Sequence, residues 1–302
     1  MRGFAWFIGL ILLGLAGIAV FAYPAWQLLT PQFDLKFHRV ASRIGMLILL
    51  IGFILVARRL QVADKASLGY GLPRREFLRQ SGIGLALGVA TMLPVMLAMV
   101  ALDLRVLRPG ITLDLATFAS LALKGLTSGI AVALIEETFL RGAMHTSIAR
   151  DAGARAAVLL TALVYAATHF IGKYRIPVEE LDAGSGLAML AGSLAAFGDP
   201  LRIADAFLCL FAVGVLLGVV RSLTGNIAAC IGLHAGWVWI ITFFRETSRR
   251  DESSPLAFLL SEFDGVVGWL VLGWTLVIGL ALYRFYGKQA AAAATRASPP
   301  SA

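Results

Sequence analysis

The sequence predicts an all-α, polytopic integral membrane protein, built as a bundle of about eight transmembrane helices. Of its 302 residues, 59% are apolar and only 15% are charged, and the mean hydropathy is +0.83. A soluble domain has about 25% charged residues. Many apolar runs approach the roughly 20 residues that cross a bilayer as a helix. These runs are continuous rather than alternating, which excludes a transmembrane β-barrel.

The apolar runs define the predicted spans. The first run is too long for the apolar region of a signal peptide and lacks a clear A-x-A cleavage site, so we expect a retained first helix. The residue ranges predicted to span the membrane are 4–28, 40–57, 81–104, 116–146, 155–172, 203–221, 226–245 and 263–284.

The spans fall into four predicted regions. Residues 1–110 hold the first three helices, 111–250 hold a core of helices four to seven, 251–288 hold the last helix, and 289–302 form a low-complexity, disordered tail. The core contains an inserted loop, 173–202, whose apolar stretch 187–197 is too short to span. We expect an interfacial or re-entrant helix there, which is either a lid over a site or an inert insertion.

Charge sets the expected orientation. With both termini in the cytoplasm, the inner loops carry 14 Lys and Arg residues and the outer loops carry 10. This modest excess favours an N-in, C-in topology. The net charge of +8 comes mostly from residues between apolar runs, where they contact lipid headgroups. The bilayer is therefore an expected partner, and nucleic acid is not.

Small residues indicate where helices pack. Glycines separated by four positions let helices approach closely in lipid. Cys209 and Cys230 each lie within an apolar run, so we expect buried hydrophobic residues rather than a redox pair. The glycine pairs are Gly84/Gly88, Gly125/Gly129 and Gly214/Gly218.

A few ionisable residues interrupt the apolar runs. Each charge at the centre of a transmembrane helix costs about 2.5–3.5 kcal/mol on insertion scales, so such residues persist where they pair, face a cavity or function. Arg43 and Lys124 are two of them. The others form a candidate site: Glu136, Glu137 and Arg141 in the fourth span, His169 in the fifth and His234 in the seventh.

Helical geometry separates the two glutamates. Glu137 and Arg141 are four residues apart, so they share a helix face and can form a structural ion pair. Glu136 points about 100° away and is left as a free carboxylate, available as a base or a ligand.

The level of the site follows from the turn between the fourth and fifth spans. A turn that ends at Gly153 places Glu136 and His169 at nearly the same height, about 25 Å from the turn. His234 lies about 12 Å into its own helix. The three side chains share one depth if the hairpin protrudes from the membrane, and the charge count makes that face cytoplasmic. His145, nine residues after Glu136, is expected on the surface of the hairpin.

One carboxylate and two imidazoles at one depth fit two kinds of chemistry. Glu136, His169 and His234 can hold Zn²⁺ with an open fourth position. Without a metal, Glu136 can act as a base on a water molecule while a histidine stabilises the oxyanion. Either route implies hydrolysis within the membrane. The structural alternative is a buried polar network that only locks helices together.

Three segments resemble the motifs of one family. The run Glu136-Glu137-Thr138-Phe139-Leu140-Arg141 resembles the EExxxR motif of the CPBP family, the CAAX proteases and bacteriocin-processing (Abi-type) intramembrane metalloproteases. The segment from Tyr165 to His169 resembles its FxxxH motif, and the segment around His234 resembles its third motif. The motifs cover residues 125–245, and no such resemblance extends to the first three spans.

The resemblance implies roles for the site residues. Glu136 would activate the attacking water, aided by His169, while His234 would hold the oxyanion or a metal. Arg141 would support the carboxylates. The resemblance implies zinc as a candidate cofactor. The resemblance also implies a peptide or membrane-protein substrate and, with the charge pattern, a bacterial cytoplasmic membrane.

One position departs from the family pattern. The third motif commonly has Asn four residues after its His, and here that residue is Val238. Asn226 lies about 12 Å along the helix from His234 and is a poor substitute. An intramembrane endopeptidase is therefore the main prediction. A catalytically weakened or inactive membrane scaffold or chaperone is the alternative, and a proton-coupled carrier is a third hypothesis.

Overall fold

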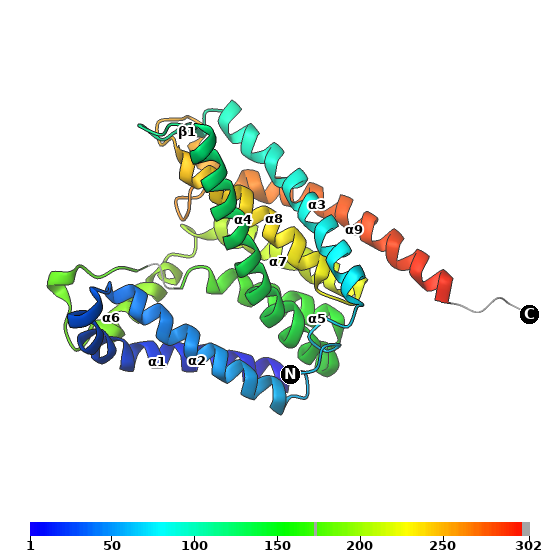
Figure 1. Ribbon diagram of the computed structural model, residues 1–302, viewed down its shortest axis with the longest axis horizontal. Helices are drawn as coiled ribbons and strands as arrows, with labels where there is room; N and C mark the ends of the chain where they lie inside the picture. Colours follow the sequence, from blue (N-terminus) through cyan, green and yellow to red (C-terminus); the bar gives the residue numbers. More distant parts are fainter. Residues whose placement is uncertain (172–173, 298–302) are drawn as a thin grey trace, which may run out of the picture.

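The computed structural model describes residues 1–171 and 174–297 (Figure 1). Helices dominate, with one short pair of strands, β1 (Arg105–Leu107) and β2 (Ser248–Arg250). A π-helix, η1 (Thr138–Met144), joins α4 to α5, and three short 3-10 turns occupy Val178–Glu180, Ala195–Gly198 and Ala257–Leu259. The α-helices are α1 (Arg2–Phe33), α2 (Phe37–Arg59), α3 (Arg74–Ala101), α4 (Leu115–Glu137), α5 (His145–Thr168), α6 (Ser185–Leu194), α7 (Ala204–Thr224), α8 (Ala228–Thr247) and α9 (Trp269–Ala297).

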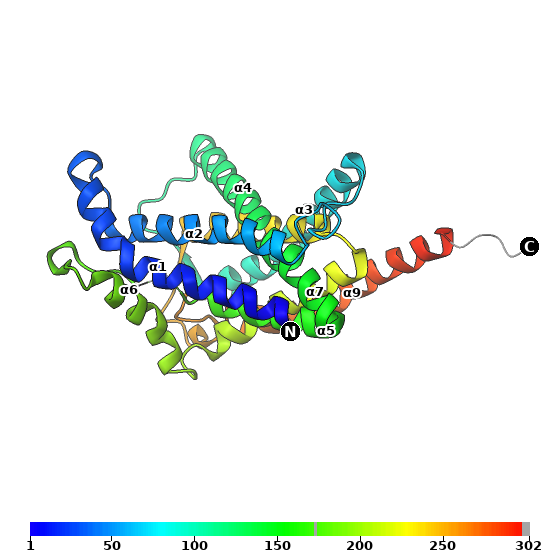
Figure 2. The ribbon, with the colours of Figure 1, turned by 90° about the horizontal axis from the view of Figure 1, so that it is seen from below.

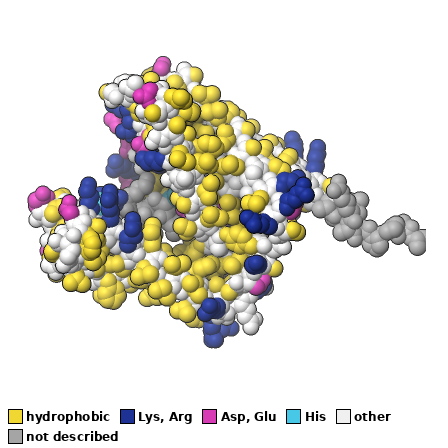
Figure 3. Space-filling view, viewed as in Figure 1, with side chains coloured by type: hydrophobic (Ala, Val, Ile, Leu, Met, Phe, Trp, Pro, Cys, Tyr) yellow, Lys and Arg dark blue, Asp and Glu magenta, His cyan; other side chains and the backbone are white. Residues whose placement is uncertain are grey.

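The helices form two arms that diverge from one end of the molecule. The antiparallel pair α1 and α2 makes one arm, and α3 and α4, both packed on α8, make the other (Figure 1). The helix α5 packs on α7, which in turn packs on α9. Hydrophobic side chains cover most of the surface in Figure 3, and Lys and Arg side chains gather toward the ends of the helices. This distribution is that of a protein surrounded by lipid.

The prediction of a polytopic membrane bundle is confirmed. Within the described residues, seven helices are long and apolar enough to cross a membrane. One of them, Leu115–Thr168, contains 54 residues and includes both the fourth and fifth predicted spans. Gly153 interrupts it with φ 83° and ψ 167°, a conformation outside the helical region that glycine adopts without a Cβ clash. The chain therefore reverses at the predicted turn.

The predicted glycine pair of α3 lies against α8. A Cβ atom on Gly84 would lie 2.6 Å from the carbonyl oxygen of Ala229, and one on Gly88 would lie 2.5 Å from that of Leu233. Any larger residue at these positions would force the two backbones apart. This contact fixes the rotation and height of α8, which carries His234.

The other two predicted glycine pairs also lie at helix contacts. A Cβ on Gly129 of α4 would lie 2.6 Å from the carbonyl oxygen of Ala235 on α8. A Cβ on Gly214 of α7 would lie 2.8 Å from Cα of Ala162 on α5. Close backbone contacts thus hold α8, which carries His234, against α3 and α4, and they hold α5 against α7. Cys209 and Cys230 are free and buried, as predicted.

The inserted loop folds partly as predicted. Its apolar stretch forms α6, which lies beside α1 in Figures 1 and 2. The contact depends on Gly186. A Cβ atom at this position would overlap the carbonyl oxygen of Ala19, so only glycine fits against α1 there. The short helix α6 therefore packs against the α1–α2 arm and is not an additional transmembrane span.

The strand pair joins the outer ends of α3 and α8. Residue Arg105 is buried, and its guanidinium donates hydrogen bonds to Oγ of Ser248 at 2.9 Å and to its carbonyl oxygen at 2.8 Å. Burial lowers the pKa of Arg105 to about 10. These hydrogen bonds join the segment that follows α3 to the segment that follows α8.

The C-terminal helix differs from its prediction. The helix α9 continues through Gln289 to Ala297, where the sequence predicted a disordered tail from residue 289. The continuation is an alanine-rich segment, and alanine has the highest intrinsic helix propensity. The remainder of the predicted tail, 298–302, lies outside the described residues.

Candidate active site

The two adjacent glutamates close α4, and the π-helix η1 begins directly after them. Single-turn π segments within α-helices occur frequently at functional sites because they re-aim side chains. Here the wider turn includes Arg141 and Gly142. A Cβ on Gly142 would lie 2.8 Å from the carbonyl oxygen of Leu68, so the segment before α3 presses against η1.

The predicted ion pair between Glu137 and Arg141 is present and fully buried. Nη1 of Arg141 donates to Oε1 of Glu137 at 3.1 Å, and both side chains have 0% exposure. Nη2 of Arg141 donates to the carbonyl oxygen of Gly214 at 3.2 Å. Nε of Arg221 donates to the carbonyl oxygen of Arg141 at 2.9 Å. The guanidinium of Arg141 thus binds both the Glu137 carboxylate and the backbone of α7.

The same carboxylate oxygen also binds the histidine of α8. Nδ1 of His234 lies 2.8 Å from Oε1 of Glu137. A carboxylate accepts hydrogen bonds, so Nδ1 carries the proton and Nε2 is directed elsewhere. Nε2 lies 3.9 Å from Oε2 of Glu136. His234 therefore stands between the two glutamates, with one ring nitrogen toward each.

Glu136 is held much less tightly than its neighbour. Its side chain is 33% exposed, whereas that of Glu137 is completely buried. Oε2 of Glu136 has no hydrogen-bond partner among the residues that the structure describes. A buried carboxylate oxygen without a partner in the protein is a place where a water molecule or ligand binds. The predicted division between a structural and a free glutamate matches this geometry.

Tyr165 connects the second histidine to this cluster. Its ring centroid lies 4.4 Å from that of His169 and 6.0 Å from that of His234, with edge-to-face geometry in both pairs. Cζ of Arg141 lies 4.8 Å from the same ring centroid. Nδ1 of His169 lies 2.7 Å from the carbonyl oxygen of Tyr165, one helical turn earlier. The structure therefore brings together residues from α4, η1, α8 and the end of α5.

A family comparison covers this cluster. A model of the type II CAAX prenyl endopeptidases, Rce1-like, matches residues 118–240, which include Glu136, Arg141, His169 and His234. This match supports the CPBP and CAAX-protease family over residues 118–240, the region in which the three motifs lie. No curated protein and no solved structure matches the chain. The matched region contains α5, α6 and α7 and most of α4 and α8, and it leaves out α1, α2, α3 and α9.

The position four residues after His234 holds Val238, which is only partly buried. Asn226 is engaged elsewhere. Its Oδ1 accepts a hydrogen bond from the backbone N–H of Ala228 at 2.9 Å, and its Nδ2 donates to Oε1 of Gln80 at 3.1 Å. Asn226 thus binds the first residue of α8 and ties that end of the helix to α3. It does not replace an amide beside His234.

His145 corrects one prediction. The sequence predicted a surface residue, but His145 is 5% exposed and its Nε2 lies 3.2 Å from Oγ of Ser222. The end of α7 covers His145, and the spacing from Glu136 could not predict that contact. Arg221, counted in the sequence as an ordinary loop charge, is buried for the same reason. Only the packing of α7 on the hairpin reveals either residue.

The predicted zinc ligands do not assemble into a metal site in this arrangement. Within the described part of the chain, no three His, Cys, Asp or Glu side chains are grouped so that they could hold one metal ion. Oε2 of Glu136 and Nε2 of His234 face each other at 3.9 Å and would supply two ligands. A zinc site requires three protein ligands at about 2 Å from the ion. Zinc binding stays a prediction, and no catalytic step below depends on it.

Proposed function

We propose that this CPBP protein is an intramembrane endopeptidase in which Glu136 activates a water molecule for attack on a peptide carbonyl. The observation that carries the proposal is the unequal environment of two adjacent carboxylates. Glu137 is buried and bound by Arg141 and His234, whereas Glu136 is partly exposed with a free oxygen. A general base needs a free lone pair that its water can reach. Oε2 of Glu137 also has no partner among the described residues, but that side chain is completely buried, so Glu136 is the carboxylate that a water molecule can approach.

The histidines support complementary roles. Glu137 fixes the Nδ1–H form of His234 and stabilises the positive charge that the ring acquires on protonation. A protonated Nε2 would donate a hydrogen bond to the developing oxyanion. His169 uses Nδ1 against the carbonyl oxygen of Tyr165, and its Nε2 would assist Glu136 in moving the proton.

The reaction balances as a hydrolysis. The water oxygen forms a bond with the peptide carbonyl carbon while Glu136 takes the water proton. The carbon–nitrogen bond then breaks, and the amine leaves with a proton returned by Glu136. The products are a carboxylate and an amine, and no other reactant is consumed.

The setting of the reaction is part of the proposal. The spans make the chain an integral membrane protein, so its substrate is a peptide or protein held at the same bilayer. The excess of basic residues in the inner loops supports an N-in, C-in orientation. Together with the family resemblance, it supports a bacterial cytoplasmic membrane. Under this orientation the turn at Gly153 faces the cytoplasm.

The decisive experiment compares new protein N-termini in membranes from cells that express the native chain, Glu136→Gln or Glu136→Ala at matched levels. Termini present only with the native chain would establish proteolysis and identify candidate substrates. Identical peptide maps, with all three proteins folded and abundant, would contradict the proposal.

A non-catalytic scaffold is the second candidate function, and Val238 favours it. An amide that the family commonly uses beside the catalytic histidine is missing at that position. A scaffold requires the helix surfaces but not the free carboxylate. Glu136→Gln would then leave every cellular effect of the protein intact.

A further inference from the structure

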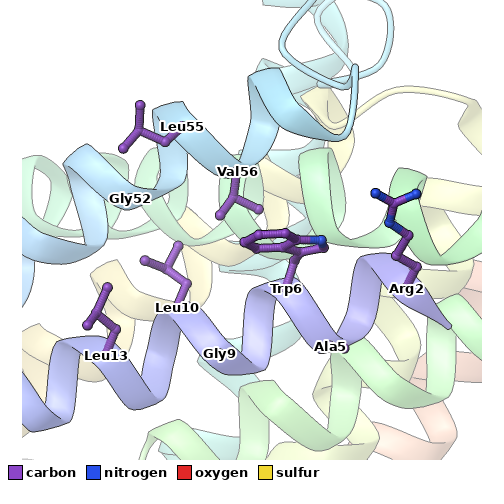
Figure 4. A pocket seen from close by; sticks show the side chains of 9 residues that line it. All are labelled: Arg2, Ala5, Trp6, Gly9, Leu10, Leu13, Gly52, Leu55 and Val56. Atoms are coloured by element: carbon purple, nitrogen blue, oxygen red, sulfur yellow. The ribbon is translucent and has the colours of Figure 1, made fainter.

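A groove runs along the outer surface between α1 and α2, in the part of the chain that the family comparison does not cover (Figure 4). It has a volume of about 600 Å³. Its walls are apolar except at one end, where Arg2 lies beside Trp6. A groove with an apolar length and a cationic end fits an amphipathic ligand.

Two glycines shape the groove. Gly9 lies in its wall, and a Cβ atom built there would meet nothing within 4 Å. Gly52, on α2, faces Leu10 so closely that no side chain fits between them. Leu10 can therefore pack against the α2 backbone and form the floor, while the space above Gly9 stays open.

The length of the groove matches one leaflet of a bilayer. Along α1 it extends over the twelve residues from Arg2 to Leu13, which corresponds to a helix rise of about 16 Å. Half of a typical hydrocarbon core is about 15 Å. An acyl chain that begins at the membrane surface near Arg2 would end at the bilayer midplane near Leu13.

The polar end has the chemistry of a lipid headgroup site. The guanidinium of Arg2 forms no hydrogen bond or ion pair with any other residue in the described part of the chain. Tryptophan is enriched at the membrane–water interface, where Trp6 would lie. Arg58 and Arg59 are exposed at the adjacent end of α2, which adds positive charge to the same face.

We propose that this groove binds an anionic glycerophospholipid, with its phosphate at Arg2 and one acyl chain along Gly9 toward Leu13. The bound lipid would fill the outer side of the α1–α2 arm. On the inner side, Phe7 and Phe53 contact Phe139 of η1, with ring centroids 5.3 and 5.7 Å away. The lipid would thus stabilise the arm that packs on the helix turn after Glu137. The assignment is independent of the proposed proteolysis.

The test measures lipids retained by the purified full chain after exposure to mixed micelles with equal amounts of phosphatidylglycerol and phosphatidylcholine, using native mass spectrometry. Gly9→Leu fills the groove, and we expect it to lose retained lipid of both classes. Arg2→Gln keeps the apolar groove, and we expect the preference for phosphatidylglycerol to fall about fivefold, the effect of one basic residue at an anionic surface.

Matched controls exist on α3. Gly82 is exposed and a Cβ there also meets nothing within 4 Å, so Gly82→Leu should leave lipid retention unchanged. Arg74 is exposed at the start of α3, and Arg74→Gln should keep the lipid preference. If Gly9→Leu does not fold, Arg2→Gln is compared with Arg2→Lys. This comparison shows whether the positive charge at residue 2 sets the preference for phosphatidylglycerol.

Three results would overturn the assignment. Gly9→Leu could retain as much lipid as the native chain, or the native chain could show no preference for phosphatidylglycerol. An excess of a lipidated peptide could displace the retained phospholipid, which would assign the groove to a lipid-modified substrate instead.

Discussion

Oε1 of Glu137 lies 2.8 Å from Nδ1 of His234, and this contact orients the ring so that Nε2 faces Glu136 at 3.9 Å. A carboxylate that holds one nitrogen of a histidine fixes its tautomer and leaves the other nitrogen for chemistry. The two neighbouring glutamates therefore differ in their surroundings: Glu137 is buried and holds the histidine, and Glu136 is the more exposed of the two.

Arg141→Met is predicted to destabilise the protein by about 3–5 kcal/mol, because it leaves the buried Glu137 carboxylate without its cation. Thermal unfolding in detergent would measure the change. The control is Lys124→Met, which breaks the exposed pair of Lys124 and Glu246 at 2.7 Å. An exposed pair contributes less than about 1 kcal/mol, so equal losses in the two variants would contradict the buried clamp.

Helical spacing was sufficient to predict the interactions within one hairpin. The four-residue separation of Glu137 and Arg141 predicted their ion pair, and Gly153 predicted the reversal that brings Tyr165 of α5 beside Arg141. Both features depend on helix geometry and on a residue that tolerates a positive φ.

Contacts between distant helices could not be predicted in the same way. The hydrogen bond of Glu137 with His234 depends on the rotation of α8, which its close contacts with α3 and α4 determine. The burial of His145 depends on α7, whose end covers the hairpin. A sequence gives the face of a helix on which a residue lies, but not which neighbour covers that face.

Val238→Asn is predicted to increase the rate of peptide hydrolysis. An amide four residues after His234 lies on the same face of α8 and would add an oxyanion donor. Removing one such donor from well-studied hydrolases costs about 10²–10³ in kcat, so the gain here is expected to be at least tenfold. The measurement is kcat on a substrate identified by the N-terminal mapping. A rate that stays unchanged would show that Val238 is not what limits the site.

Metal removal separates the two mechanisms that the residues permit. Because Glu136, His169 and His234 do not form a metal-binding group in the structure, we expect hydrolysis to continue at its full rate in excess chelator. The assay uses the purified native chain with and without chelator, followed by zinc replacement. Loss of activity that zinc restores would instead support the three residues as ligands.

Gly88→Ala is predicted to lower stability and activity together. Its new methyl group would lie 2.5 Å from the carbonyl oxygen of Leu233, the residue before His234, so α8 would have to move. Overpacking of this kind costs about 1–3 kcal/mol. The matched control is Gly82→Ala on the same helix, where a Cβ meets nothing within 4 Å and the higher helix propensity of alanine favours the fold. Unfolding temperature and hydrolysis rate are measured for both variants. If Gly88→Ala behaves like Gly82→Ala, backbone contact between α3 and α8 does not set the position of His234.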